Sequence, residues 1–429
     1  MNFMEGTGMT TSASPKTVFE TVCVVGLGYI GLPTAAFIAS RGPRVIGVDV
    51  KQSFVDQINA GEVPFFEPDF DVLLKEVVKD GKLSAQTDTP VADAYIVAVP
   101  TPFKDDYAVD TKYIQAAAKN IAPQLKGGEL IVLESTSPPG TTEKMAEFIL
   151  AERSDLTMED GLENSVYFAH APERVLPGRI MAEMSANDRV IGGVTPRASE
   201  MARDLYATFS NGELLVTDAK TAEMAKLTEN SFRDVNIAFA NELSIISERL
   251  GIDVWELIEL ANHHPRVNIL QPGPGVGGHC IAVDPWFIVN AAPEESRLIR
   301  TAREVNDGKP VYVLDKVEAL AQRFKDPVVA ALGIAFKANI DDLRESPSLN
   351  IVDKLATDVA GVDVRVVEPN VEELPEQLSR HENVRKQDLE GAIADADIVL
   401  LLVDHDSFKT LDQELLKEKV IVDTKGVWR

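Results

Sequence analysis

The stretch that decides the fold of this 429-residue chain is Val22-Cys-Val-Val-Gly26-Leu-Gly28-Tyr-Ile-Gly31, followed by Asp49 at the end of the next apolar run. Four apolar residues predict a buried strand, the glycines a tight turn, and the small residues after Gly31 a helix. The first glycine permits the turn, the second lets backbone amides approach a pyrophosphate, and the third lets the helix pack on the strand. A carboxylate about 20 residues later binds a ribose 2′-hydroxyl and repels a 2′-phosphate. The stretch therefore predicts a dinucleotide-binding turn that prefers NAD to NADP.

Strand and helix alternate on both sides of a helical middle. Apolar runs at 45–48, 95–99 and 130–133 predict further strands of a first parallel sheet, and runs at 328–332, 364–367, 398–403 and 420–422 predict a second. Residues 219–250 contain no Pro or Gly and predict a long helix, and 297–324 predict another that is broken around Gly308 and Pro310. The predicted fold class is α/β, with two Rossmann-like doubly wound parallel-sheet domains joined by a central helical region.

The expected organisation has four parts: a flexible tail at 1–20, a dinucleotide-binding domain at 21–215, a central helical region at 216–312 and a second α/β domain at 313–429. Residues 1–16 are small and polar. They lack the charged start and the apolar stretch of a signal peptide, so we expect a loose tail on a cytoplasmic protein.

Composition excludes several classes of partner. The 42 basic and 68 acidic groups give a net charge of −26, which disfavours nucleic acid because phosphate contacts depend on clustered Lys and Arg. No apolar run approaches the roughly 18 to 20 residues of a spanning helix, so we expect no membrane partner. Two cysteines cannot form a disulfide framework, and Cys23 lies in an apolar run where it should pack as a small hydrophobe. Cys280 is therefore the cysteine that chemistry could use.

Cys280 closes the stretch Gly273-Pro-Gly275-Val-Gly277-Gly278-His279-Cys280, which is followed shortly by Asp284. Crowded glycines let backbone amides approach a ligand and suit a nucleophile whose adduct carries negative charge on oxygen. A lone cysteine is more often inert and buried. Because the chain also carries a dinucleotide-binding turn, we favour a thiol that attacks an aldehyde.

Lys226, Asn230 and Arg233 share one face of the long predicted helix, at i, i+4 and i+7. A polar stripe usually marks a solvated face. Here the helix continues with apolar residues at 237–240, so amine, amide and guanidinium groups could converge on an anionic ligand.

Hydroxyl-rich turns follow two of the predicted strands. Pro100-Thr101-Pro102 follows one, and Glu134-Ser-Thr136 opens the turn after the next. Both turns should lie at the carboxyl edge of the sheet, where ligands bind in open α/β folds, although ordinary turns have the same composition.

At these residues the chain resembles the UDP-glucose/GDP-mannose dehydrogenase family, and within it the branch that acts on UDP-N-acetyl-D-mannosamine. The resemblance runs from residue 22 to 429. Its most specific segments are 26–33, 98–104, 172–178, 226–242, 264–287, 336–347 and 420–429.

The resemblance implies NAD at the first domain, a UDP-sugar at the second and a homodimer formed through the central region. It implies that the sugar C6 alcohol is oxidised twice with two NAD, for cell-surface polysaccharide biosynthesis. Cys280 would capture the C6 aldehyde as a thiohemiacetal, a second hydride transfer would give a thioester, and water would release the uronate.

The resemblance also assigns roles to individual residues, and none of them is a metal ligand. Lys226 would be proton donor and acceptor, with Asn230 and Asp284 beside it, while Glu173 and Thr136 would position or activate water. The cofactor would contact Gly26, Gly28, Tyr29, Ile30, Gly31, Asp49, Thr101 and Thr142. The substrate would contact Arg174, Val175, Lys226, Asn230, Arg233, His264, Arg266, Gly277, Phe336, Lys337, Arg344 and Lys425.

The chain departs from the UDP-glucose branch around the cysteine. That branch has Gly-Gly-Ser-Cys-Phe-x-Lys-Asp, whereas this chain has His279 in place of Ser and Val283 in place of Lys. The difference favours UDP-N-acetyl-D-mannosamine. The 6-dehydrogenation of UDP-GlcNAc, UDP-GalNAc or UDP-glucose remains the alternative, because a difference in pocket shape is worth only a few kcal/mol.

Two other functions remain open from the residues alone. A two-electron 3-hydroxyacid dehydrogenase shares the Rossmann-plus-helical plan but requires neither Cys280 nor the last domain. A catalytically silent nucleotide-sugar sensor would bind NAD only as a structural ligand.

Overall fold

A computed structural model describes residues 18–65, 67–104, 107–176, 178–278 and 281–429. Most of the expected tail at 1–20 lies outside these residues. Within the described part, the chain divides into two compact units, which meet in sequence between Lys226 and Leu227. No helix of the described part is long and apolar enough to cross a membrane.

The first unit is built around a sheet that, in the described residues, has eight strands in the order β3-β2-β1-β4-β5-β6-β7-β8. The strands are β1 (Thr21–Val25), β2 (Arg44–Val48), β3 (Leu83–Gln86), β4 (Ala94–Val97), β5 (Leu130–Leu133), β6 (Tyr167–His170), β7 (Arg189–Gly193) and β8 (Leu214–Asp218). The helices are α1 (Gly31–Ala39), α2 (Gln52–Asn59), α3 (Phe70–Lys79), α4 (Lys112–Ile121), α5 (Thr141–Glu152), α6 (Ile180–Glu183) and α7 (Pro196–Tyr206). The sheet is parallel except where β6 pairs with β7.

Both faces of this sheet are covered, which explains why its strands are continuous apolar runs. In β1, Val22 and Val24 face the core that contains residues of α1, α3 and α7, while Cys23 and Val25 face the core that contains residues of α4 and α5. Cys23 is fully buried, which confirms its predicted packing role. Burial raises the pKa of the Cys23 thiol to about 12, so this thiol stays protonated.

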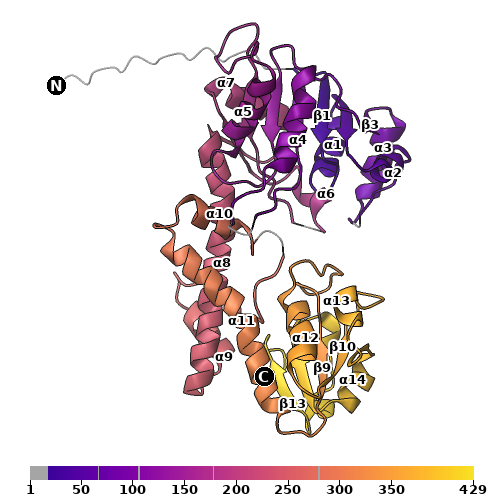
Figure 1. Cartoon of the computed structure of the whole chain (residues 1–429), viewed down its shortest axis with the longest axis vertical. Helices are drawn as coiled ribbons and strands as arrows, with labels where there is room; N and C mark the ends of the chain where they lie inside the picture. The colour runs from indigo at the N-terminus through magenta and orange to yellow at the C-terminus, as the bar shows by residue number, and fades with distance from the viewer. Residues whose placement is uncertain (1–17, 66, 105–106, 177, 279–280) are drawn as a thin grey trace, which may run out of the picture. The chain divides into compact units, whose positions relative to one another are not determined.

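The second unit has a parallel sheet that, among the described residues, contains five strands in the order β11-β10-β9-β12-β13. The strands are β9 (Val328–Leu332), β10 (Asp363–Val367), β11 (Val384–Lys386), β12 (Ile398–Leu401) and β13 (Val420–Asp423). The helices are α8 (Ala219–Leu250), whose first residues belong to the first unit, α9 (Val254–Asn262), α10 (Asp284–Ala291), α11 (Arg297–Ala321), α12 (Pro347–Asp358), α13 (Glu376–Ser379), α14 (Leu389–Asp395) and α15 (Asp406–Lys409). The predicted α/β class with two doubly wound sheets and a helical middle is confirmed (Figure 1).

The predicted break near Pro310 is wrong, because α11 continues through Pro310 to Ala321. A proline removes one backbone hydrogen bond of a helix. Tertiary contacts hold the helix on both sides of it: Arg303 pairs with Asp234 before the proline, and the Tyr312 hydroxyl donates to Glu248 after it. Packing therefore overrides the local signal.

Candidate functional site

In the glycine turn after β1, Gly26 and Gly31 are packed against backbone atoms, whereas the space beside Gly28 is open. Gly26 has φ +93°, and a Cβ added there would lie 2.5 Å from the Ala98 carbonyl oxygen. A Cβ on Gly31 would lie 1.9 Å from the Gly26 carbonyl oxygen, whereas one on Gly28 would meet nothing within 4 Å. Side chains are excluded where strand, turn and helix meet. Ile30 is the N-cap residue of α1, so the open space at Gly28 lies beside the N-terminus of this helix. A pyrophosphate fits such a space.

Asp49 fixes the turn through its carboxylate. One oxygen accepts the Leu27 amide at 3.0 Å, and the other accepts the Lys51 amide at 2.9 Å. Asp49 is half-buried, so its negative charge lies at the edge of the turn, where a ribose would bind.

Tyr29 links the turn to the segment that leads into α6. Its hydroxyl donates to the Glu67 carboxylate and accepts the Gly178 amide at 2.9 Å. Glu67 also accepts the Ile180 amide at 2.8 Å. The predicted cofactor residue Tyr29 is therefore held at the carboxyl edge of the sheet.

The turns after β4 and β5 lie together, as their place in the sheet predicts. The Thr101 hydroxyl donates to the Thr136 carbonyl oxygen at 2.7 Å, and the Ser135 hydroxyl donates to the Val99 carbonyl oxygen at 2.6 Å. The structure thus brings the predicted cofactor residue Thr101 to the predicted catalytic residue Thr136.

Thr142 has a partner that the sequence did not indicate. Its hydroxyl and amide donate to the Glu223 carboxylate at 2.7 and 2.8 Å, and the Gly140 amide donates to the same carboxylate at 2.6 Å. Burial raises the pKa of Glu223 to about 7. Glu223 thereby ties the start of α8 to the start of α5, and cofactor contact by Thr142 stays a prediction.

Glu134 is a buried acid that the sequence did not single out. It accepts hydrogen bonds from the Thr34 hydroxyl at 3.1 Å and the Tyr206 hydroxyl at 3.0 Å. Burial and the neighbouring Glu173 carboxylate raise the pKa of Glu134 to about 8. Glu134 is therefore largely protonated at neutral pH.

Glu173 and Arg189 form a buried ion pair at 2.9 Å. The Arg189 guanidinium also lies over the rings of Tyr206 and Phe209. The other Glu173 oxygen accepts the backbone amides of Arg174 and Val175 at 2.7 and 3.1 Å. Glu173 thus holds the backbone of two predicted substrate residues, and removing either ion-pair partner would leave an uncompensated buried charge.

In the second unit, Asn230 donates a hydrogen bond to the buried Asp284 carboxylate at 2.5 Å. Asp284 is the first residue of α10. His279 and the predicted nucleophile Cys280 lie outside the described residues. The helix carrying Asn230 is therefore tied to the point where the chain emerges from the predicted nucleophile segment.

Predicted substrate residues of the second unit also meet. A Cβ on Gly277 would lie 2.8 Å from the Phe336 Cβ and 2.7 Å from the Pro347 Cδ, so the glycine segment packs directly on the turn after β9. The Lys425 ammonium lies 3.7 Å from the position of a Cβ on Gly273 and 3.3 Å from the Asp404 carboxylate.

The remaining predicted basic groups are more accessible. Lys226 is half-buried on α8, and the exposed members of the set are Arg233, His264, Arg266, Lys337 and Arg344. Arg344 pairs with Asp342 at 2.6 Å, and Arg174 donates to the Asp188 carbonyl oxygen at 3.2 Å. Exposed ion pairs are weak, so a bound diphosphate could replace Asp342 at Arg344.

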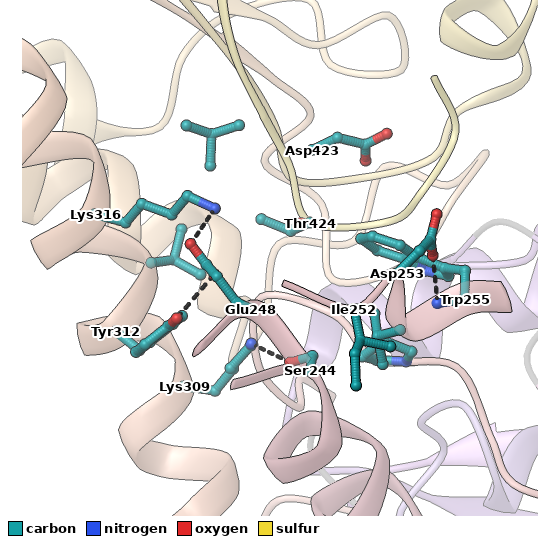
Figure 2. A pocket seen from close by; sticks show the side chains of 14 residues that line it. Ser244, Glu248, Ile252, Asp253, Trp255, Lys309, Tyr312, Lys316, Asp423 and Thr424 are labelled. Atoms are coloured by element: carbon teal, nitrogen blue, oxygen red, sulfur yellow. Dashed lines mark hydrogen bonds and ion pairs between the residues drawn. The ribbon is translucent and has the colours of Figure 1, made fainter. Parts of the chain in front are cut away.

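A cavity of about 300 Å³ lies between α8, α11 and the end of β13 (Figure 2). Lys309 donates to the Ser244 hydroxyl at 2.5 Å, and Glu248 accepts the Tyr312 hydroxyl and pairs with Lys316, both at 2.8 Å. Burial lowers the pKa of Lys309 to about 8. The residues that line the cavity come from segments that no sequence motif connects.

Among the described residues, no group of three acidic, His or Cys side chains is placed to hold a metal ion.

Comparison with known proteins places the chain in a family. The models of the UDP-glucose/GDP-mannose dehydrogenase family match in order: the NAD binding domain at 20–210, the central domain at 220–308 and the UDP binding domain at 330–429. The chain belongs to the UDP-glucose/GDP-mannose dehydrogenase family. The predicted family and the predicted NAD cofactor are confirmed, and the UDP binding domain indicates a UDP-sugar substrate.

Relatives within the family carry different substrate names. An NDP-N-acetyl-D-galactosaminuronic acid dehydrogenase of Ralstonia nicotianae is 58% identical over 412 residues, covering 96% of each chain. A UDP-N-acetyl-D-mannosamine dehydrogenase of Escherichia coli is 54% identical over 421 residues, covering 96% of this chain and 100% of its own. The solved UDP-D-ManNAc dehydrogenase of Pyrococcus horikoshii has a TM-score of 0.84 at 38% identity, with 95% of this chain and 96% of that chain covered.

The position of Asp49 predicts strong discrimination between the two nicotinamide cofactors. We expect NADP to be at least about 100-fold poorer than NAD in kcat/KM, because a 2′-phosphate would face a fixed carboxylate. Asp49→Asn keeps an oxygen for a backbone amide but removes the charge, so it should lower the NAD-to-NADP ratio of kcat/KM about tenfold. Asp56→Asn, on the exposed face of α2, should leave that ratio unchanged. Equal efficiency of the wild-type protein with both cofactors would contradict this role.

The raised pKa of Glu134 predicts a pH-dependent stability. The folded chain holds this proton more tightly than the unfolded chain, whose carboxyl has its ordinary pKa of 4.5. The neutral carboxyl therefore stabilises the fold at low pH, and that stability is lost as pH rises towards about 8, by up to about 1.4 kcal/mol per pH unit.

Glu134→Gln mimics the neutral carboxyl group at every pH, so it removes the loss of folding stability that occurs as pH rises. Its Tm, measured relative to wild type, should rise steadily from pH 5 to 8.5, whereas Glu147→Gln on the exposed face of α5 should track the wild-type protein. A Tm difference for Glu134→Gln that does not change with pH would show that the buried carboxyl does not titrate in this range.

Proposed function

We propose that the protein catalyses the NAD-dependent four-electron oxidation of the C6 alcohol of UDP-N-acetyl-D-mannosamine to the uronate. The observation that carries the proposal is the hydrogen bond from Asn230 to the buried Asp284. It joins α8, which also carries Lys226, to the helix that begins four residues after Cys280. Amine, amide, carboxylate and thiol are the groups that repeated oxidation at one carbon requires.

The chemistry proceeds in two oxidations on one bound sugar. NAD, when bound, accepts the hydride from C6. Lys226 takes the proton of the C6 hydroxyl and, as an ammonium, stabilises negative charge on that oxygen. The Cys280 thiolate then adds to the aldehyde carbon to form a thiohemiacetal, whose oxidation gives a thioester. Water breaks the carbon–sulfur bond and regenerates the thiol, so one alcohol, two NAD and one water yield one carboxylate, two NADH and three protons.

Glu173 and Thr136 are proposed to act on the hydrolytic step. Glu173 is one residue from Arg174 and holds its amide, so it controls the backbone beside the predicted sugar contacts. Thr136 lies in the turn that Thr101 contacts. In this proposal the Glu173 carboxylate positions the attacking water while it remains paired with Arg189.

Recognition of the two ligands follows the domain division proposed from the sequence: 21–215 for NAD, 216–312 for dimerisation and catalysis, and 313–429 for the UDP-sugar. NAD is assigned to Gly26, Gly28, Tyr29, Ile30, Gly31, Asp49, Thr101 and Thr142. The UDP-sugar is assigned to Arg174, Val175, Lys226, Asn230, Arg233, His264, Arg266, Gly277, Phe336, Lys337, Arg344 and Lys425. Arg344, Lys337 and Lys425 supply the cations for the diphosphate.

The relatives support both an N-acetylmannosamine and an N-acetylgalactosamine series. We place UDP-N-acetyl-D-mannosamine first because the His279-Cys280 segment with Val283 resembles that branch, and we retain UDP-GalNAc, UDP-GlcNAc and UDP-glucose as alternatives. We further propose that the enzyme acts in the cytoplasm, where its product enters cell-surface polysaccharide biosynthesis.

A panel of UDP-sugars tests the function directly. With NAD in excess and limiting sugar nucleotide, UDP-N-acetyl-D-mannosamine should give two NADH per molecule and the highest kcat/KM of the four sugars. A yield of one NADH would indicate a single two-electron oxidation, and no NADH with any sugar would indicate a silent sensor. Higher efficiency with another UDP-sugar would reassign the substrate.

A homodimer through the central helical region is also proposed, and one face of α8 supports it. Phe232, Phe239 and Ile246 recur every seven residues and are 69%, 50% and 46% exposed. A heptad-spaced apolar stripe on a long helix suits packing against the same stripe of a second copy.

Phe239→Glu should convert the dimer to monomers, because it places a charge in the middle of that stripe. Leu415→Glu, at an exposed apolar position outside α8, should remain dimeric. Sedimentation velocity measures both masses. A dimer of undiminished affinity in Phe239→Glu would exclude this face of α8 as the interface.

A further inference from the structure

Polar side chains connect α8 to α11 along much of their length; we call these contacts the α8–α11 bridges. Asp234 pairs with Arg303 at 2.6 Å, and the Asn241 amide donates to the Asn306 side-chain oxygen at 2.9 Å. The bridges that line the cavity of Figure 2 are Lys309 with Ser244, and Tyr312 and Lys316 with Glu248. Each bridge holds one helix against the other.

The Asn241 bridge differs from its neighbour at Ser244 because it also reaches the glycine-rich segment. The Asn241 side-chain oxygen accepts the Gly273 amide at 2.9 Å. Asn241 is fully buried, so this hydrogen bond has no competition from water. Gly273 begins the segment that contains Gly277 and ends at Cys280.

The orientation of the Asn241 amide is dictated by the groups behind it. The Asn306 amide nitrogen donates to the carbonyl and the side-chain oxygens of Asp234 at 3.0 and 2.8 Å. Asp234 in turn accepts from the buried Arg303 guanidinium. Asn306 must therefore offer its oxygen to Asn241, so the nitrogen of Asn241 faces Asn306 and its oxygen faces Gly273.

Close packing leaves the segment little room to shift from this anchor. A Cβ on Gly275 would lie 2.8 Å from the Pro347 Cβ and 3.0 Å from the Pro310 Cγ, and Gly277 is as tightly packed. Pro310 lies on α11, four residues after Asn306. The segment is thus pressed between α11 and the start of α12, with its first amide bound by α8.

We propose that Asn241 is a positioning residue that fixes the segment 273–278, and with it the predicted substrate residue Gly277, relative to Asn230 on the same helix. This inference rests on the proposed function, since it assigns Asn241 to the geometry of that reaction. Asn241 itself does not touch the reacting atoms. Its oxygen holds the first amide of the segment, and the Asp234–Arg303 pair keeps that oxygen in place through Asn306.

The test compares Asn241→Leu with Ser244→Ala in the full-length protein. Ser244→Ala removes the neighbouring bridge without touching the segment. Asn241→Leu should raise hydrogen exchange of the Gly273 amide, measured on a peptide covering 268–278, by at least about tenfold. It should also lower kcat for UDP-sugar oxidation at least about tenfold, with the KM for NAD within about twofold. Ser244→Ala should leave the exchange and kcat near wild-type values even where it lowers Tm.

A conservative variant separates positioning from stability. Asn241→Asp keeps one oxygen that can accept the Gly273 amide. Its second oxygen replaces the nitrogen that donates to Asn306, so two oxygens then face each other there. It should therefore lower Tm and yet retain slow Gly273 exchange and most of kcat. Should Asn241→Leu fail to fold, Asn241→Ala carries the same comparison.

The outcomes are distinguishable. If the Gly273 amide exchanges at the same rate in Asn241→Leu as in Ser244→Ala, Asn241 does not hold the segment and the proposal is wrong. Faster exchange with unchanged kcat overturns the positioning role and leaves the proposed function intact. A wild-type protein that oxidises no UDP-sugar contradicts the proposed function, and the exchange measurement then still decides whether Asn241 holds the segment.

Discussion

The close backbone approach at the first glycine turn is the constraint on which the cofactor unit depends. Gly26 is so near Ala98, and Gly31 so near Gly26, that a methyl group at either position would collide with backbone. Strand β1, the end of β4 and helix α1 can meet only without side chains there. The same geometry leaves open space at Gly28 and the first amides of α1 beside it. The turn therefore creates an anion site as a direct consequence of how tightly it is packed.

The second sheet repeats this arrangement. Gly333 follows β9 with φ +87°, and a Cβ there would lie 2.4 Å from the Val403 Cβ, after the neighbouring strand β12. The Gly333 amide donates to the Val367 carbonyl oxygen, as the Gly26 amide does to that of Val48. Glu368, after β10, accepts the amides of Ile334 and Ala335, much as Asp49 accepts those of Leu27 and Lys51. Both sheets thus place a glycine turn and a fixed carboxylate at the same point of a shared strand order, which is the expected place for a nucleotide.

Sequence reasoning succeeded where the signal is local. Residues close together in the sequence were enough to predict the glycine turn, the position of Asp49, the long helix α8 and the apolar strands. It failed where distant residues decide the outcome, as in α11, which passes through Pro310 because α8 holds it on one side, and it missed β8, which is too exposed to show a buried apolar run. The buried polar groups were missed for the same reason. Glu134 lies 100 residues from Thr34 and 72 from Tyr206, and Asn241 lies 65 residues from Asn306, so no spacing in the sequence connects them.

The central claim is that one thiol, at the end of a glycine-rich segment, carries the sugar between its two oxidations. Intact-protein mass spectrometry of Glu173→Gln, quenched in acid after incubation with NAD and UDP-N-acetyl-D-mannosamine, tests it most directly. Gln can still accept the Arg174 amide but leaves the buried Arg189 charge without its partner, so the variant must first show a wild-type circular-dichroism spectrum at the assay temperature; in folded protein, hydrolysis should slow. We expect a mass increase equal to the acylating sugar nucleotide, localised to Cys280 and absent when Cys280 is replaced by Ala. An unmodified Cys280 in a sample that has produced two NADH per sugar, or undiminished turnover by Cys280→Ala, would contradict it.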